Sequence, residues 1–500
     1  MTDSAVLTAH ASASSPSAST DAATLDAVAA AAAAAAPLVR ASADADCAGW
    51  LRAVADALDA NAAELVAIAD EETHLGTVRL TGEVARTTEQ LRLFATVVDD
   101  GAWREITVDH ADASATPPRP EIRRMLTAVG PVAVYSASNF PFAFSVAGGD
   151  TASALAAGCP VIVKAHSGHP RLSVRTAEIV TDALTTAGAP DGIFALVVGR
   201  EAGNALVQHP AIAAAGFTGS LSGGRALFDL ASGRPDPIPF YGELGSINPV
   251  VITAAAIAAR GGSLATGLAG SFTLGSGQFC TKPGVVFVPT GTAFADDLAA
   301  AVGPATTGRL LTDRIASAFP VGLAALAADD SVTIVVGAID SDTDAPQPVV
   351  LRTDARAVAT RPDTLLEECF GPVTLLVEYA DEAELFAALG ALGGSLTATL
   401  HSEPGEEVAS LVERLSQVAG RVLFAGWPTG VAVTWSQHHG GPWPATTSLH
   451  TSVGASAIRR FLRPIAFQDA PDALLPAPLR DANLAAAPRR VDGTLLLAAG

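Results

Sequence analysis

Basic residues are scarce in this sequence, and lysine is almost absent. Its 500 residues include 51 acidic and 30 basic side chains, which leaves a formal net charge of −21 at pH 7. Nucleic-acid phosphates and anionic membrane surfaces repel such an acidic chain, so we expect neither as a partner. The two lysines, Lys164 and Lys282, stand against 28 arginines. Either these positions require a slim ammonium group, or they are chance survivors of a biased codon usage.

Cysteine is scarce too, and no segment has the pattern of a secretion signal. The four cysteines lie far apart and include no Cys-x-x-Cys pair, which argues against a zinc knuckle or a disulfide framework. The alanine-rich run 27–39 is too short to span a bilayer, and no basic segment precedes a truly apolar one. We therefore expect a cytoplasmic protein.

The arrangement of apolar and polar segments predicts an α/β protein of two or three domains. Residues 1–24 begin with a Ser/Ala/Thr-rich stretch and are expected to form a disordered tail. Helical periodicity covers 44–70 and 79–98, and the polar, proline-containing segment 103–124 is expected to be a hairpin arm.

From residue 129 onward, short apolar runs alternate with helix-like stretches, which is typical of βαβ units and a parallel sheet. The expected strands are 131–135, 160–164, 193–198 and 214–218, and the expected helices are 145–157, 171–187, 201–208 and 222–231. A second mixed region has strand-like runs at 284–288, 332–336, 373–377 and 421–424.

Two segments contain residues that suit covalent catalysis. Glu243 lies between glycines in Phe-Tyr-Gly-Glu-Leu-Gly-Ser-Ile-Asn-Pro (240–249), and Cys280 lies in Gly-Ser-Gly-Gln-Phe-Cys-Thr-Lys-Pro-Gly (275–284). A thiol nucleophile and a separate carboxylate that activates water are the minimum for forming and hydrolysing a thioester. Taken alone, each residue is more often an inert thiol or a surface carboxylate. The hypothesis of covalent catalysis therefore depends on finding Cys280 and Glu243 together.

The glycine-rich segment 216–224 predicts backbone N–H groups at a helix start, which suits a pyrophosphate. It matches neither G-x-G-x-x-G nor Walker A, and alone it fits an ordinary helix start equally well.

Six motifs, in one order, resemble those of the aldehyde dehydrogenase superfamily. They are Ser-Asn-Phe-Pro at 138–141, Lys164, Phe-Thr-Gly-Ser at 217–220, Glu-Leu-Gly at 243–245, Gly-Gln-x-Cys at 277–280 and Glu-x-Phe-Gly-Pro at 368–372. The resemblance implies a cofactor-binding domain (25–102 and 125–243) and a catalytic domain (244–449). It also implies segments (103–124 and 450–500) that pair across subunits of a homodimer or homotetramer.

The resemblance further implies the role of each site residue. Cys280 would attack an aldehyde, Asn139 and the Cys280 N–H would hold the oxyanion, and Glu243 would deprotonate the hydrolytic water. Whether Glu243 also takes the thiol proton stays open. The residues assigned to NAD(P) are Lys164, Gly219, Ser220, Gly224, Glu368 and Phe370. Ser167 replaces the Glu that NAD-preferring relatives carry, and Arg200 can pair with a 2′-phosphate. We expect NADP, leave NAD use open, and note that Arg200 also fits a plain surface residue.

Longer stretches resemble the α-ketoglutaric semialdehyde dehydrogenase group, which includes NADP-dependent fatty aldehyde dehydrogenases. These stretches are 72–92, 139–150, 428–431, 439–447 and 451–464. The expected reaction is oxidation of 2-oxoglutarate semialdehyde (2,5-dioxopentanoate) to 2-oxoglutarate, with a long-chain aldehyde as the alternative. Ala432, the segment 435–438 and the bulky Trp443 depart from the group. No arginine for a substrate carboxylate can be placed from sequence.

Two other classes remain open: a thiol esterase or acyl transferase without redox chemistry, and a non-catalytic oligomeric homologue. Lys164 and Glu368 argue against the first, and the presence of Cys280, Glu243 and Asn139 argues against the second. His438 and His439 are adjacent in a loop and seldom chelate one ion in that arrangement, so no metal is expected.

Overall fold

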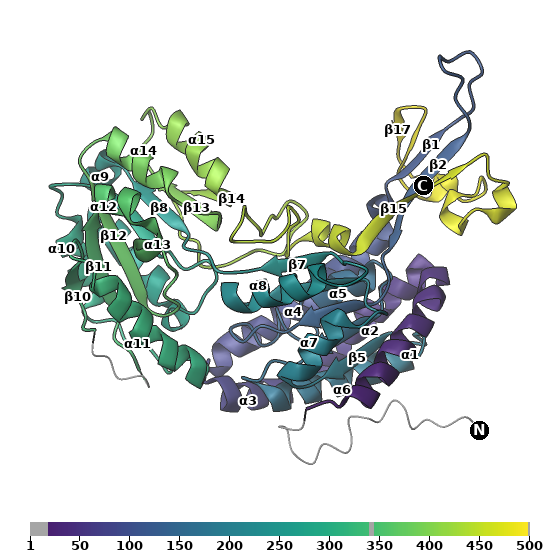
Figure 1. The fold of residues 1–500 in the computed structure, drawn as a ribbon, viewed down its shortest axis with the longest axis horizontal. Coiled ribbons are helices and arrows are strands. Elements are labelled where there is room, and N and C mark those ends of the chain that lie inside the picture. The colour runs from purple at the N-terminus through teal and green to yellow at the C-terminus, as the bar shows by residue number, and fades with distance from the viewer. Residues whose placement is uncertain (1–18, 340–344, 499–500) are drawn as a thin grey trace.

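The computed structural model describes residues 19–339 and 345–498 and contains three sheets (Figure 1). Two of them form the cores of separate α/β bodies, and the third belongs to an arm that projects away from both. The α/β prediction is confirmed. Of the expected tail, residues 1–18 lie outside the described residues.

The first sheet is entirely parallel and has the strand order β5-β4-β3-β6-β7. Its strands are β3 (Val132–Tyr135), β4 (Val161–Lys164), β5 (Phe194–Val197), β6 (Ala214–Thr218) and β7 (Phe240–Glu243). The helices of this body are α1 (Ala22–Ala41), α2 (Asp44–Ala60), α3 (Ala62–Thr73), α4 (Thr77–Asp100), α5 (Gly149–Ala156), α6 (Pro170–Thr186), α7 (Arg200–Gln208) and α8 (Leu221–Ser232). Apolar cores on both faces explain why most positions of these strands are apolar rather than alternating with polar ones.

Helix α1 corrects two expectations. It begins at Ala22, within the expected tail, because the Asp21 side chain accepts a hydrogen bond from the Thr24 N–H and caps the helix. The second expectation concerned length: the alanine-rich run 27–39 was judged too short to span a bilayer, but α1 has 20 residues. Among the described residues, α1 is the one helix whose length and composition would allow a bilayer crossing, a test that core helices also pass. Its buried Leu25 and Ala29 pack in the core on one face of the first sheet.

The second sheet has the order β10-β11-β12-β9-β8-β13-β14, and β10 is antiparallel to its neighbour. The strands are β8 (Pro249–Ile252), β9 (Val285–Pro289), β10 (Thr333–Val336), β11 (Val349–Asp354), β12 (Val373–Tyr379), β13 (Ser395–His401) and β14 (Ala419–Phe424). The helices are α9 (Ala254–Thr273), α10 (Phe294–Val302), α11 (Asp313–Ala327), α12 (Ala355–Thr360), α13 (Pro362–Leu365), α14 (Glu382–Gly390) and α15 (Ala409–Val418). Separate apolar cores cover its two faces.

The arm joins segments from both ends of the chain, in the order β15-β2-β1-β16-β17 (Figure 1). Its strands are β1 (Ile106–Asp109), β2 (Ile122–Ala128), β15 (Leu462–Gln468), β16 (Arg489–Val491) and β17 (Thr494–Leu496). Strand β2 runs past the expected end of the arm because it pairs with β15 along its whole length. The expected helix 145–157 is shortened to α5, since residues 141–148 form turns.

Candidate functional site

The carboxyl edge of the first sheet collects most of the predicted site. In a parallel sheet the loops after the strands meet at one edge, where ligands bind. Asn139 follows β3, Lys164 ends β4, and Glu243 ends β7. The remaining residues predicted on this edge are Ser167 after β4, Arg200 after β5, and Gly219, Ser220 and Gly224 after β6.

Lys164 and Arg200 lie close together where the adenosine ribose of the cofactor is predicted to bind. Burial and the nearby positive charge of Arg200 both lower the pKa of Lys164. Ser167 and Arg200 are exposed, so both are open to a ligand. The Ser220 hydroxyl caps α8 by accepting the Gly223 N–H at 3.3 Å. The helix start, the cations and the glycine-rich loop fit a phosphate-bearing cofactor.

Glu368 reaches this edge from the second body, where it precedes β12 together with Phe370. The Ser246 N–H donates to its carboxylate at 3.3 Å. A Cβ at Gly245 would lie 2.6 Å from the same carboxylate oxygen, so only glycine permits this approach. Burial raises the pKa of Glu368 to about 7, against the attraction of Lys282. The Glu-Leu-Gly and Glu-x-Phe-Gly-Pro motifs therefore meet in space.

Cys280 lies in a tight turn that neighbouring backbone holds in place. The preceding residues Gly275, Ser276 and Gly277 have φ of 56°, 57° and 71°. A Cβ at Gly277 would collide with the Gly371 carbonyl, so this glycine is required by space as well as by conformation. The Asn248 side-chain amide donates to the Cys280 carbonyl at 2.8 Å, which fixes the turn.

Lys282 is structural in this arrangement rather than part of the reacting group. Its buried ammonium donates to the carbonyls of Cys369, Gly371 and Val373 at 2.7, 3.1 and 3.1 Å. The scarce lysine thus ties the cysteine turn to the Glu-x-Phe-Gly-Pro segment, and all three of its donors are used.

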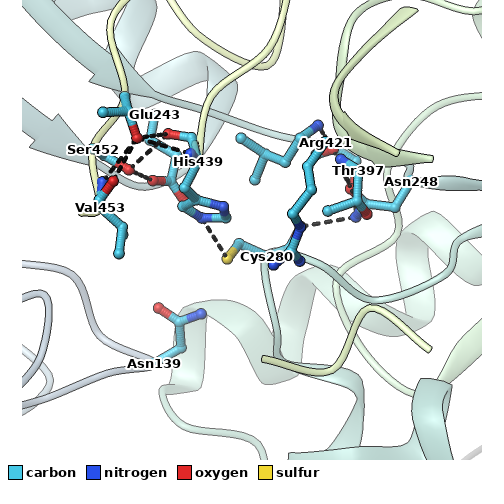
Figure 2. Close-up of polar contacts among 12 residues, drawn as sticks. Asn139, Glu243, Asn248, Cys280, Thr397, Arg421, His439, Ser452 and Val453 are labelled. Atoms are coloured by element: carbon cyan, nitrogen blue, oxygen red, sulfur yellow. Dashed lines mark hydrogen bonds and ion pairs between the residues drawn. The ribbon is translucent and has the colours of Figure 1, made fainter. Parts of the chain in front are cut away.

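The thiol faces a buried histidine that the sequence interpretation set aside. His439 Nε2 lies 3.6 Å from Cys280 Sγ and 3.0 Å from Glu243 Oε1 (Figure 2). Ser452 donates to the other Glu243 oxygen at 2.6 Å. Both Glu243 and His439 are buried. The stretch 439–447 had marked a family resemblance but gave His439 no role, because its contacts join residues 159 and 196 positions apart.

Hydrogen bonds hold the loop that carries His439 against the first sheet. Leu244 donates its N–H to the Ala445 carbonyl at 2.8 Å, and Thr447 donates to the Gly242 carbonyl at 3.0 Å. The loop therefore lies alongside the end of β7 and delivers His439 to the thiol. Trp443, expected near the substrate entrance, is half-exposed and lies near Arg225, whose Cζ is 5.8 Å from its ring centroid.

Electrostatic interactions shift the pKa of the Glu243 carboxyl and that of the Cys280 thiol in opposite directions. Burial raises the pKa of Glu243, but the attraction of His439 and hydrogen bonds from His439, Ser452 and Cys280 outweigh it, so the net shift is downward. Burial and the neighbouring Glu243 charge raise the pKa of Cys280 well above its usual range, against the opposing pull of Arg86. These shifts favour an ionised carboxylate at Glu243 and a protonated thiol at Cys280.

Asn139 lies on another side of the thiol from Glu243 (Figure 2). Its Nδ2 donates to the Gln278 carbonyl at 3.1 Å, two residues before the cysteine. This contact holds the amide beside the cysteine turn. The amide and the Cys280 turn can thus present donors to one oxygen.

Two arginines lie near enough to the thiol to interact with it electrostatically. Arg86, on α4, lies over the rings of Phe144 and Phe140, with its Cζ 5.3 and 5.7 Å from their centroids. Burial lowers its pKa, while the charges of Glu83, Cys280 and Glu243 oppose this shift. Arg421, on β14, has buried Nε and Nη2 atoms without a hydrogen-bond partner among the described residues. Sequence interpretation missed both residues.

Comparison with known proteins agrees with this geometry. The model of the aldehyde dehydrogenase family matches residues 9–443. An α-ketoglutaric semialdehyde dehydrogenase 2 of Azospirillum brasilense is 46% identical over 464 residues, covering 91% of this chain and 88% of its own. An α-ketoglutaric semialdehyde dehydrogenase of Acinetobacter baylyi is 41% identical over 456 residues, covering 90% and 87%.

Solved structures share the fold at low sequence identity. Aldehyde dehydrogenase C of Pseudomonas syringae, solved as a mutant with NAD⁺ and octanal, has a TM-score of 0.77 at 20% identity and covers 90% of both chains. Aldehyde dehydrogenase 21 of Physcomitrella patens, solved with succinate, has a TM-score of 0.76 at 21% identity and covers 91% of this chain and 92% of its own. The predicted fold and resemblance are thus confirmed. The chain belongs to the aldehyde dehydrogenase family, a family of NAD(P)-dependent oxidoreductases.

Proposed function

We propose that the chain oxidises an aldehyde to a carboxylic acid through a thioester on Cys280. The observation that carries this proposal is the grouping of Glu243 and Asn139 around the turn that holds Cys280 (Figure 2). Cys280 Sγ forms a bond to the aldehyde carbon, and the resulting oxyanion accepts from the Asn139 amide and the Cys280 N–H. Bound NAD(P) supplies the hydride acceptor. Glu243 then deprotonates a water that attacks the thioester, and the thiolate leaves as the acid forms.

Residue His439 gives the thiol proton a path. A single nitrogen, Nε2, faces both Cys280 and Glu243, so it cannot donate to the carboxylate and accept from the thiol at once. In one tautomer it donates to Glu243; in the other it accepts the proton of Cys280. We infer that His439 takes the thiol proton as substrate arrives, and that Glu243 remains ionised for the later hydrolysis.

For the substrate we propose 2-oxoglutarate semialdehyde, oxidised to 2-oxoglutarate. Two relatives named for this activity are 46% and 41% identical to the chain. Arg86 supports a substrate with a carboxylate, because its partly buried guanidinium lies near enough to Cys280 and Glu243 to interact with both electrostatically. A carboxylate one short chain away from the aldehyde carbon would satisfy it.

A long-chain aldehyde is the second candidate. Phe140, Phe144 and Phe279 gather near the thiol turn, with the Phe140 ring 5.5 Å from Phe144 and 5.2 Å from Phe279. These rings offer an apolar wall to an alkyl chain. The partly buried Arg86 beside them favours the carboxylated substrate, since an alkyl chain would add no counter-charge there.

For the cofactor we propose NADP as the preferred form, with NAD use still open. Lys164 and Arg200 place two positive charges together, and Ser167 adds no negative charge that would repel a 2′-phosphate. We also propose a cytoplasmic homo-oligomer in which the arm pairs across subunits.

The test is cofactor reduction by purified protein, followed by ultraviolet absorbance, with 2-oxoglutarate semialdehyde, glutaraldehyde and long-chain aldehydes. Both NADP and NAD are tried, and Cys280→Ala is the control. Reduction that favours the oxo-acid aldehyde and disappears in the variant is the expected result. Reduction with long-chain aldehydes alone would support the second candidate. Folded protein that reduces neither cofactor, but hydrolyses thiol esters through Cys280, would instead be an esterase.

A further inference from the structure

Three different ligand types meet at the thiol. Cys280 Sγ, His439 Nε2 and a Glu243 carboxylate oxygen all lie within 4.8 Å of one another. Sulfur, imidazole nitrogen and carboxylate oxygen are the three donor types that Zn²⁺ takes from proteins. Each comes from a different segment, and hydrogen bonds hold the Glu243 and His439 backbones in place.

The spacing also agrees with tetrahedral coordination. Zinc bonds of ordinary length at tetrahedral angles put sulfur and nitrogen about 3.6 Å apart and nitrogen and oxygen about 3.3 Å apart. The structure has 3.6 Å between Sγ and Nε2, and 3.0 Å between Nε2 and Oε1. An ion between all three atoms then requires Nε2 and Oε1 to separate by a few tenths of an ångström, with Sγ and the carboxylate oxygen, which lie within 4.8 Å, about 3.6 Å apart.

We propose that Cys280, His439 and Glu243 form a three-ligand site for Zn²⁺, which holds the enzyme in a reversible inactive state. The fourth position of the ion would be left to water, as in open zinc sites. An ion at this position occupies the sulfur lone pair that must attack the aldehyde and the carboxylate that must activate water. Zinc and substrate therefore exclude each other.

The protons balance without a co-reactant. Cys280 loses its thiol proton to solvent as sulfur bonds to the ion, and Glu243 is already ionised. When His439 donates from Nε2 to Glu243, that proton moves to Nδ1 so that Nε2 can offer its lone pair. Nδ1 is buried without a hydrogen-bond partner among the described residues. Because strong zinc sites support this second nitrogen, we expect weaker binding than at a structural zinc site.

The surrounding charge is compatible with an ion of this kind. Ionised Cys280 and Glu243 together supply two negative charges against the two of the metal. Arg86 and Arg421 lie near enough to interact electrostatically with Cys280 and would weaken binding. Occupation thus depends on free zinc concentration, which makes the site inhibitory rather than structural.

The binding test uses Co²⁺ as a spectroscopic stand-in for Zn²⁺ and the full-length chain. We expect one Co²⁺ per chain with a thiolate-to-cobalt charge-transfer band, displaced by Zn²⁺ and removed by a chelator. Cys280→Ser should abolish the band. Losing a supporting contact costs about 10- to 100-fold in metal affinity, so losing a ligand in His439→Asn should cost about 100-fold or more. His438→Asn is the matched control and should bind as the wild type does.

The inhibition test adds buffered Zn²⁺ to the dehydrogenase assay. Inhibition that a chelator reverses, and that aldehyde relieves competitively, is expected. A wild-type protein without the charge-transfer band, or a Cys280→Ser variant that binds cobalt equally well, would overturn the site. The inhibition rests on the proposed function, but the binding does not. A protein that binds cobalt through Cys280 and oxidises no aldehyde would leave the site standing and refute the proposed function.

Discussion

Replacing Arg86 by methionine separates a carboxylate-binding role from a structural one. Methionine keeps much of the length and the contact with Phe144 and Phe140, but it removes the charge. A hydrogen bond to a charged group contributes about 1.5–3 kcal/mol, and each 1.36 kcal/mol is tenfold in rate. We therefore expect kcat/KM for 2-oxoglutarate semialdehyde to fall by about 10- to 150-fold.

The same variant should act differently on an uncharged aldehyde. Pentanal also has five carbons but carries neither the carboxylate nor the 2-oxo group, so its kcat/KM should change little or rise. Most of the loss on the oxo-acid aldehyde should appear in KM, because the contact is made before the chemical step as well as during it. Arg92→Met is the matched control on the same helix. Its guanidinium pairs with Asp56 and Asp59.

The measurement is a steady-state comparison of the two aldehydes at saturating cofactor for wild type, Arg86→Met and Arg92→Met. Melting curves check that both variants fold. An equal loss on both aldehydes would refute the reasoning, because it would mean that Arg86 supports the thiol or the phenylalanine wall rather than a substrate charge. An unchanged kcat/KM for the oxo-acid aldehyde would also refute it.

Three further predictions concern residues that the structure brings together. Ser452→Ala removes a hydrogen bond that lowers the pKa of Glu243; activity depends on the ionised carboxylate, so the acidic limb of the pH–rate profile should move to higher pH by up to about one unit. A pH–rate profile that does not move would mean that the ionisation of Glu243 does not control the rate. Asn139→Ala should lower kcat by about 100- to 1,000-fold with little change in cofactor binding, which stopped-flow and fluorescence titration can measure. Arg460→Met leaves the buried Asp150 carboxylate, now 2.7 Å from Arg460, without its cation and should cost about 3–5 kcal/mol of unfolding free energy; a denaturation midpoint equal to the wild type would contradict this.

Much of the fold follows from local patterns. The apolar runs at 131–135, 160–164, 193–198 and 214–218 became β3 to β6, because a strand buried on both faces must be apolar throughout. Parallel connection then brings the ends of these strands to one edge, so residues at strand ends gather without further information. This is why Asn139, Lys164 and the 216–224 loop, which the family resemblance grouped together, lie at the same edge.

Other features depend on contacts that local sequence does not encode. Lys282 was marked by its rarity, but only the structure shows its ammonium bound to three carbonyls. Helix α1 extends beyond the expected run because of a cap at Asp21 and a buried face against the first sheet. The interaction that decides the role of Lys282 is with groups far along the chain. The one that decides the start of α1 involves a single side chain, Asp21, which has no part in the periodic pattern.

The amino-acid sequence by itself determined the family, and it marked Cys280 and Glu243 as the candidate nucleophile and base, since motifs are read from residue types in order along the chain. The tertiary structure decided what surrounds them. His439 reaches the thiol through a loop pinned to the end of β7, and Arg86 arrives on a helix nearly 200 residues before Cys280 in the chain. His439 and Arg86 come close to Cys280 because the two α/β domains and the loop pack together. The free energy that stabilises this packing is spread over many contacts. Periodicity and motif spacing report on neighbours in the chain, whereas these contacts exist only once the chain has folded.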